Sequence, residues 1–221
     1  MAQLAKPFLS LPNATILLAS ASSARQNILR AAGIDYEILP VAIDEAHVRA
    51  GAFADDMMLE DIAVLLASLK AQAASQRISD VLTVPSTTYI IGADQILVCE
   101  GKIINKPATI LAAKDQLLWL SGKSHKLLSA IVLFRDGQRI WHHLAESTLT
   151  MRQIDVVFAD SYIQHIGDAA LWSPGAYQIE SFGTSLFSKI DGDYFDILGL
   201  PLLPLLSILR EHGLSPVECF P

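Results

Sequence analysis

The sequence predicts an α/β fold in which a long, mostly antiparallel or mixed sheet is flanked by helices. Short apolar runs typical of strands alternate with longer segments of helical periodicity along the 221 residues. Hydrophobic residues make up 52% of the chain and charged residues 18%, so a substantial core can form. A chain of this length suits one large domain or two small lobes. We expect two lobes around a central cleft.

The N-terminal half contains two predicted strands and two predicted helices. The first strand, 15–19, leads through a serine-rich turn into a helix at 24–32 that Gly33 closes. A second strand covers 36–41. Apolar residues then recur at helical spacing from 55 to about 79 and predict a long amphipathic helix.

The C-terminal half is predicted to contain two hairpins, three helices and one further strand. The first hairpin occupies 89–107, and Asp136 with Gly137 is a strong turn signal for the second. The other predicted elements are a helix at 109–120, hairpin strands at 127–135 and 139–151, a helix at 155–166, a strand at 185–190 and a leucine-rich helix up to His212.

The composition narrows the classes of partner. The formal net charge is −7 and there is no basic run, which argues against binding of a nucleic-acid polymer or an anionic membrane. The longest apolar stretch, 197–209, is broken by glycine and proline and is too short for a spanning helix. We therefore expect a soluble, cytoplasmic protein. One domain is predicted at 15–213, between tails at 1–14 and 214–221.

The hairpin 89–107 places an acid inside a strand. Asp94 interrupts an apolar run, and burying a carboxylate is costly without a partner. A structural interpretation requires only such a partner. A functional interpretation makes Asp94 a catalytic or metal-binding carboxylate, with Lys106 brought close by the returning strand. We favour the functional interpretation because acid, tight turn and cation occur within one hairpin.

The serine-rich turn between the first strand and the first helix is a second candidate site. Backbone N–H groups, the Ser20 and Ser22 hydroxyls and the positive end of the helix dipole suit an anion. Ser22 or Ser23 could instead only cap the helix. Arg25 lies in the first helical turn, where it opposes the dipole, and this favours phosphate binding.

Several motifs resemble those of the Maf family, nucleotide pyrophosphatases related in fold to the inosine triphosphatases. The stretch 18–25, LASASSAR, is similar to the family's opening pattern A-S-x-S-P-R-R. Here Ser23 replaces the proline, Ala24 replaces the first arginine, and Arg25 keeps the second. Further similarities lie at 66–71, 91–95, 106–107, 121–125, 175–183 and 190–201. Together they cover nearly the whole domain and imply an elongated, inosine-triphosphatase-like fold of the Maf/Ham type.

The resemblance assigns catalytic roles to two carboxylates. It implies that Asp94 and Glu45 bind a divalent cation, expected to be Mg²⁺ or Mn²⁺, and orient or deprotonate a water. Glu45 directly follows Asp44, and adjacent acids after a strand are otherwise usually solvated turn residues.

The resemblance also implies a set of phosphate contacts. Lys70 would otherwise be interpreted as an exposed lysine on an amphipathic helix. In the family setting L-A-x-x-K-A it becomes a phosphate contact. The full predicted substrate-binding set is Ser20, Ser22, Arg25, Lys70 and Lys106.

Three positions are predicted to select the base. Family members that take thymidine and uridine triphosphates have Arg, Thr and Gln where this chain has Ala24, Gln95 and Glu180. The branch that takes 7-methylguanosine triphosphate resembles this chain at the last two positions but has a bulky aromatic at the first. An ionised Glu180 only accepts hydrogen bonds and suits the donor-rich edge of guanine. We therefore expect a guanine-type or modified purine.

The predicted function is hydrolysis of a nucleoside triphosphate to a nucleoside monophosphate and pyrophosphate, with a house-cleaning role. The alternative is a non-catalytic or weakly active regulatory protein, because Maf proteins are associated with septum formation and cell division arrest. The placed charges argue against an inactive enzyme. A homodimer is a further implication of the resemblance.

Overall fold

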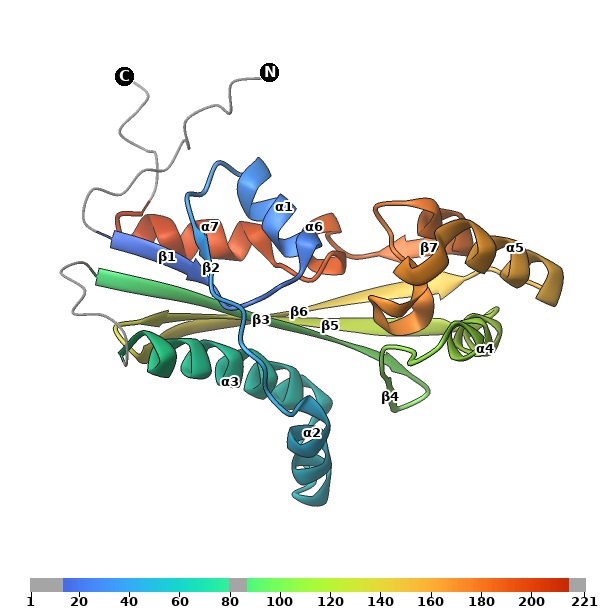
Figure 1. Ribbon diagram of the computed structural model, residues 1–221, viewed down its shortest axis with the longest axis horizontal. Helices are drawn as coiled ribbons and strands as arrows, with labels where there is room; N and C mark the ends of the chain where they lie inside the picture. The colour runs from blue at the N-terminus through green and yellow to red at the C-terminus, as the bar shows by residue number, and fades with distance from the viewer. Residues whose placement is uncertain (1–13, 80–86, 215–221) are drawn as a thin grey trace. The chain divides into compact units, whose positions relative to one another are not determined.

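The computed structural model describes residues 14–79 and 87–214 (Figure 1). The chain divides into two compact units. Among the described residues, unit 1 comprises 14–79, 87–94, Ala130–Leu144 and 199–214. Unit 2 comprises Gln95–Ser129 and Ala145–Leu198. The division into one domain at 15–213 with tails stays a prediction, and the tails fall almost wholly outside the described residues.

A mixed seven-stranded sheet confirms the predicted fold class. Its order is β2-β1-β3-β5-β6-β7, with β4 paired to β3. Strand β1 runs parallel to both β2 and β3, whereas β4 is antiparallel to β3 and β7 is antiparallel to β6. The strands are β1 Ala14–Leu18, β2 Glu37–Ile38, β3 Thr87–Cys99, β4 Lys102–Ile104, β5 Ser124–Arg135, β6 Gln138–Met151 and β7 Phe187–Asp191.

Helices begin where the sequence offers caps. Thr109, Asp155 and Asp193 each accept a hydrogen bond from the first turn of the helix that follows, as good N-cap residues do. The α-helices are α1 Ser23–Ala31, α2 Glu45–Ala54, α3 Leu59–Ser79, α4 Ile110–Leu120, α5 Val156–Ile166, α6 Tyr194–Ile197 and α7 Leu202–Glu211. Three short 3₁₀ segments lie at Gly167–Leu171, Pro174–Ala176 and Phe182–Leu186.

The structure departs from the sequence prediction mainly between residues 36 and 59. The strand predicted at 36–41 pairs over two residues only, because β2 meets just the last two residues of β1. Helix α2 was not predicted. It starts at Glu45, and Asp44 caps it by accepting a hydrogen bond from the backbone N–H of His47 at 2.9 Å. The long predicted helix starts at Leu59, later than 55.

In unit 1, α3 covers one face of the sheet and α1 and α7 lie on the other (Figure 1). The α3 face is lined by small buried residues, among them Ala67 and Ala71. A Cβ atom at Gly92 of β3 would lie 2.3 Å from the Ala67 carbonyl oxygen and 2.8 Å from the Ala71 Cβ. Gly92 therefore permits close approach of the helix backbone to the strand.

Unit 2 has its own core, built from α4, α5 and the ends of β3, β5 and β6. It encloses a polar pair in which His125 Nε2 and the Tyr177 hydroxyl are 2.7 Å apart. Burial lowers the pKa of His125 to about 4. Burial also raises the pKa of Tyr177, so both groups are neutral at pH 7.

No helix among residues 14–79 and 87–214 is both long and apolar enough to cross a membrane.

Candidate active site

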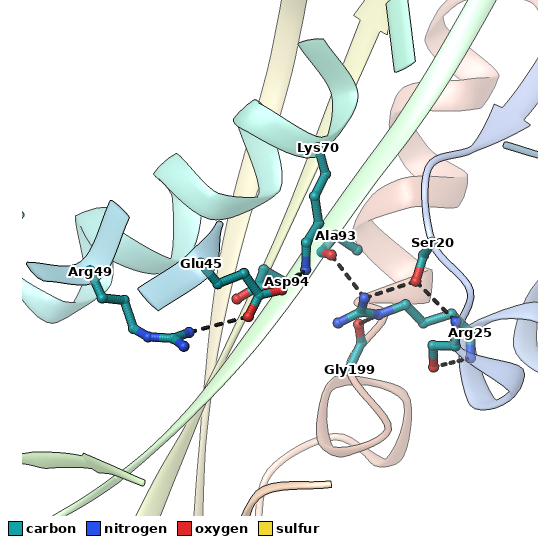
Figure 2. A network of polar contacts seen from close by, with 9 residues as sticks. Ser20, Arg25, Glu45, Arg49, Lys70, Ala93, Asp94 and Gly199 are labelled. Carbon is teal, nitrogen blue, oxygen red and sulfur yellow. Dashed lines mark hydrogen bonds and ion pairs between the residues drawn. The ribbon is translucent and has the colours of Figure 1, made fainter. Parts of the chain in front are cut away.

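The two predicted catalytic carboxylates share one cation in unit 1. Lys70 extends from α3 and forms ion pairs with Asp94 of β3 and with Glu45 at the start of α2 (Figure 2). The distance from Lys70 Nζ to Glu45 Oε1 is 2.8 Å. The Asp94 side chain is 7% exposed and that of Lys70 13%, whereas Glu45 is 38% exposed. Three segments distant in sequence thus form one cluster.

Opposite pKa shifts separate the two carboxyl groups. Burial raises the pKa of Asp94 above its ordinary value, although Lys70 and Arg25 oppose the shift. Burial also acts on the pKa of Glu45, but hydrogen bonds and charge from Lys70 and Arg49 outweigh it and the net pKa is lowered. Carboxyl groups with diverging pKa values suit different roles. The raised pKa makes Asp94 the stronger proton acceptor of the two.

Arg25 is buried, and it donates to two backbone carbonyls and to one serine hydroxyl. Its Nε donates to the Gly199 carbonyl at 2.8 Å, and its Nη1 donates to the Ala93 carbonyl at 2.8 Å and to Ser20 Oγ at 3.1 Å (Figure 2). Burial lowers the pKa of the guanidinium, while the charges of Asp94 and Glu45 oppose that shift. The Arg25 guanidinium is therefore held at the backbone of Ala93, the residue that precedes Asp94 in β3.

The serine-rich turn is tied into the same arrangement. Ser20 Oγ accepts a hydrogen bond from the Ser22 backbone N–H at 3.2 Å as well as from Arg25. Ser22 caps α1, since its Oγ accepts from the Arg25 N–H at 3.4 Å. The capping role considered for Ser22 is thus present. A phosphate-binding role for this turn stays a prediction.

The remaining predicted site residues divide between the two units. Ala24 lies in α1 of unit 1 and is half-buried. Lys106 is an exposed residue of unit 2 that follows β4. Glu180, also in unit 2, is exposed. Gln95 is half-buried in unit 2 and donates to Ser129 and to two backbone carbonyls.

Sequence reasoning missed two members of the unit 1 cluster. Arg49 lies one helical turn after Glu45, and its Nη1 is 3.2 Å from Glu45 Oε2. The i, i+4 spacing of an acid and a base was a readable signal, but it has meaning only once α2 is recognised. The Gly199 carbonyl is the second, and no local sequence pattern announces that it accepts from Arg25.

The donor chemistry of the cluster fits a divalent cation. Glu45 and Asp94 already converge on one positive charge, the Lys70 ammonium. Mg²⁺ commonly uses one or two carboxylates together with substrate phosphates and water, rather than an all-protein cage. Residues 14–79 and 87–214 contain no cluster of three or more His, Cys, Asp or Glu that could hold a metal.

Comparison with known proteins identifies the family. The model of the Maf-like protein family matches residues 15–212. The chain is 42% identical over 197 residues to the "Nucleoside triphosphate pyrophosphatase" of Granulibacter bethesdensis, covering 89% of this chain and 96% of that protein. It is 44% identical over 198 residues to the protein of the same name from Caulobacter vibrioides, covering 90% and 96%.

A differently named relative is equally similar. The "7-methyl-GTP pyrophosphatase" of Brucella abortus is 44% identical over 197 residues, covering 89% of this chain and 96% of that protein. The family match and these relatives agree with the motifs and with the mixed sheet. The chain belongs to the Maf family.

Proposed function

We propose that this protein hydrolyses the α–β phosphoanhydride of nucleoside triphosphates, releasing a nucleoside monophosphate and pyrophosphate. The observation that carries the proposal is the meeting of Asp94, Glu45 and Lys70 in unit 1, with buried Arg25 beside Asp94. The names of the similar proteins, nucleoside triphosphate pyrophosphatase and 7-methyl-GTP pyrophosphatase, support the same reaction class.

Asp94 is proposed to act as the general base. It accepts a proton from a water whose oxygen attacks the α-phosphorus, and the bond from that phosphorus to the bridging oxygen breaks. Pyrophosphate leaves with the electron pair of that bond. The raised pKa of Asp94 improves its affinity for the proton, while Lys70 keeps the carboxylate ionised often enough to act.

Cations offset the charge that develops on the phosphate oxygens. Lys70 and Arg25 are held in place by the contacts described above, so little reorganisation is needed during the reaction. Ser20, Ser22 and Lys106 are proposed as further phosphate contacts. Glu45 and Asp94 are the residues that would hold Mg²⁺ or Mn²⁺, which when bound would neutralise phosphate charge.

The base is proposed to be guanine or a modified guanine. An ionised Glu180 offers only acceptors, which match the N1–H and N2–H₂ donors of guanine and oppose the O4 acceptor of uracil or thymine. Ala24 and Gln95 complete the proposed base-selecting set. A house-cleaning role in the cytoplasm, as a homodimer, without a nucleic-acid polymer or a membrane as partner, completes the proposal.

Pyrophosphate release across a nucleotide panel tests the proposal. Purified protein with Mg²⁺, and separately with Mn²⁺, is assayed with GTP, 7-methyl-GTP, ITP, ATP, UTP and dTTP. We expect stoichiometric nucleoside monophosphate and pyrophosphate, with purines of the guanine type turned over fastest. Release of inorganic phosphate instead would contradict the bond assignment, and fastest turnover of UTP or dTTP would contradict the base assignment. No turnover of any nucleotide would favour the regulatory alternative.

A further inference from the structure

Lys70 and Arg49 already contact most of the carboxylate oxygens of the unit 1 cluster. Lys70 Nζ pairs with Glu45 Oε1 at 2.8 Å and with Asp94 Oδ1 (Figure 2). Arg49 Nη1 lies 3.2 Å from the second oxygen of Glu45, Oε2. Three of the four carboxylate oxygens therefore face a cation of the protein itself. A divalent cation that bound both carboxylates would have to share an oxygen of Glu45 with Lys70 or Arg49.

The cluster has a positive formal charge. The two carboxylates contribute −2, and the side chains of Lys70, Arg49 and Arg25 contribute +3, which leaves +1. Arg25 belongs to this count because its charge acts on both carboxylates from a buried position. The adjacent Asp44 is exposed, and its Oδ1 is used in capping α2. Buried charges are screened little by salt, so the cluster should repel a free divalent cation and attract a polyphosphate.

A bound phosphate chain would reverse this balance. It brings several negative charges and further oxygen ligands, and Mg²⁺ is commonly held by one or two carboxylates together with substrate phosphates. The Lys70 ammonium has three hydrogens and, within the described chain, directs two of them to carboxylates, so one remains for a phosphate oxygen. Phosphate oxygens thus offer Lys70 alternative acceptors, and carboxylate oxygens become available to the cation.

We infer that Lys70 is the internal counter-ion of Glu45 and Asp94 and keeps a free divalent cation out of the cluster until a phosphate chain is bound. The cation is then held together with the nucleotide rather than ahead of it. Lys70 thereby sets the order of binding, in addition to its proposed contact with phosphate. The inference rests on the proposed function for the identity of the phosphate chain.

Water proton relaxation tests the inference without depending on turnover. Mn²⁺ relaxes water protons more strongly when it tumbles with a protein, so the relaxation rate reports bound Mn²⁺. With wild-type protein and Mn²⁺ alone, we expect no saturable enhancement below about 1 mM Mn²⁺. Addition of tripolyphosphate, a phosphate chain without a base, should produce the enhancement by forming a complex of protein, tripolyphosphate and Mn²⁺.

Lys70→Met removes the counter-ion and should affect cation and anion binding in opposite directions. Mn²⁺ alone should bind this variant at least about 10-fold more tightly than the wild type. Tripolyphosphate alone, measured by calorimetry in EDTA, should bind at least about 10-fold more weakly. Lys70→Arg keeps the charge and should exclude Mn²⁺ as the wild type does. Circular dichroism checks that each variant is folded.

Arg139→Met is the matched control for the loss of one positive charge. Arg139 is an exposed residue of β6 and donates to Ser68 of α3 at 3.1 Å, so it contacts the helix that carries Lys70. Among the described residues it forms no ion pair with Glu45 or Asp94. Its replacement should change both affinities less than about 2-fold.

Four results would overturn the inference. They are saturable binding of Mn²⁺ to the wild-type protein without tripolyphosphate, no bound Mn²⁺ when tripolyphosphate is present, affinities of Lys70→Met within about 2-fold of wild type, or equal changes in Lys70→Met and Arg139→Met. The first two need only the wild-type protein, so the test does not depend on the folding of Lys70→Met. Failure of the proposed function is a separate outcome, because it appears as the absence of pyrophosphate release from nucleoside triphosphates.

Discussion

Each unit buries a polar cluster, and the two clusters differ in charge. In unit 2, burial keeps His125 neutral, and one hydrogen bond joins it to the Tyr177 hydroxyl. In unit 1, Lys70 contacts two carboxylates. A neutral buried pair can serve packing alone, whereas buried charge is costly and persists only where partners compensate it. The comparison therefore favours the charged cluster of unit 1, rather than the neutral pair of unit 2, as the place of the proposed proton transfer.

The largest expected effect is on turnover in Asp94→Asn. Asparagine has the same shape but cannot accept the proton from water, so kcat/KM should fall about 1,000-fold. Lys70 keeps Glu45 as a partner, so the fold should persist, as checked by circular dichroism and thermal melting. Asp191→Asn, at an exposed position of β7, is the control and should retain full activity. Activity of Asp94→Asn within 10-fold of wild type would remove Asp94 from the mechanism.

Lys70→Met should destabilise the protein by removing the cation of the charged cluster. Asp94 would lose its closest cation inside the protein, and unfolding free energy at pH 7 should fall by about 3 kcal/mol. The Asp94 pKa would rise further, so the native state would bind a proton more readily than the unfolded state. The deficit should therefore shrink as the pH falls. Urea denaturation at pH 7 and pH 5 measures both effects.

A lysine-to-methionine substitution in an exposed ion pair provides the comparison for Lys70→Met. Lys114 pairs with Asp160, whose side chain is 57% exposed. Lys114→Met should cost less than about 1 kcal/mol at either pH, because exposed ion pairs contribute little. Equal losses in the two variants would mean that burial of the Lys70 cluster has no energetic consequence.

The neutral pair of unit 2 predicts a pH dependence of the opposite sign. The pKa of His125 is lowered to about 4, so between pH 6.5 and 4 the unfolded chain binds the extra proton. Stability from this group is complete above pH 6.5 and is lost toward pH 4, by about 3 kcal/mol. Replacing both partners, in His125→Phe with Tyr177→Phe, should remove this dependence and change stability at pH 7 by about 1 kcal/mol or less.

Other carboxyl groups titrate in the same range, so the difference between the two proteins is the quantity to measure. Chemical denaturation from pH 8 to pH 4 provides it. A difference that does not vary with pH would show that His125 is not held neutral.

The smallest expected effect is that of Arg49→Gln, at the more exposed side of the charged cluster. Arg49 pairs with Glu45, which is 38% exposed, so Arg49→Gln should change unfolding free energy by less than about 0.5 kcal/mol. The pKa of Glu45 should move upward, because one of the groups that lower it is removed. Denaturation and kcat/KM together check this. A loss of activity as large as that of Asp94→Asn would place Arg49 in the chemistry.

Most elements of the fold could be predicted because their signals are local. The apolar run of β3, the turn after it and the Thr109 cap are all readable within a few residues. The extent of β2 could not be predicted, since the length of a strand depends on the strand beside it. Helix α2 was missed because Glu45 and Asp44 resembled turn residues and its apolar stripe is weak.

Some features of the candidate site could likewise be predicted from the sequence, and others could not. Asp94 was recognised from its place inside an apolar strand, whereas Glu45 and Lys70 were assigned only through the family resemblance. Packing of α3 on β3 brings Lys70 to Asp94. The orientation of the Gln95 carboxamide could not be predicted. It depends on carbonyls about a hundred residues later in the chain, which have no side-chain signature.

Gly92 carries no functional group, yet it governs the electrostatics of the site. Lys70 lies on α3 between Ala67 and Ala71, the two residues that leave no room for a side chain at Gly92. A methyl group there would push the helix outward and lengthen the path from Lys70 to Asp94. The pKa of Asp94 would then rise. The acid limb of the pH profile of the proposed activity would shift to higher pH. The spacing between two backbones thus acts as a tuning element for the proposed base.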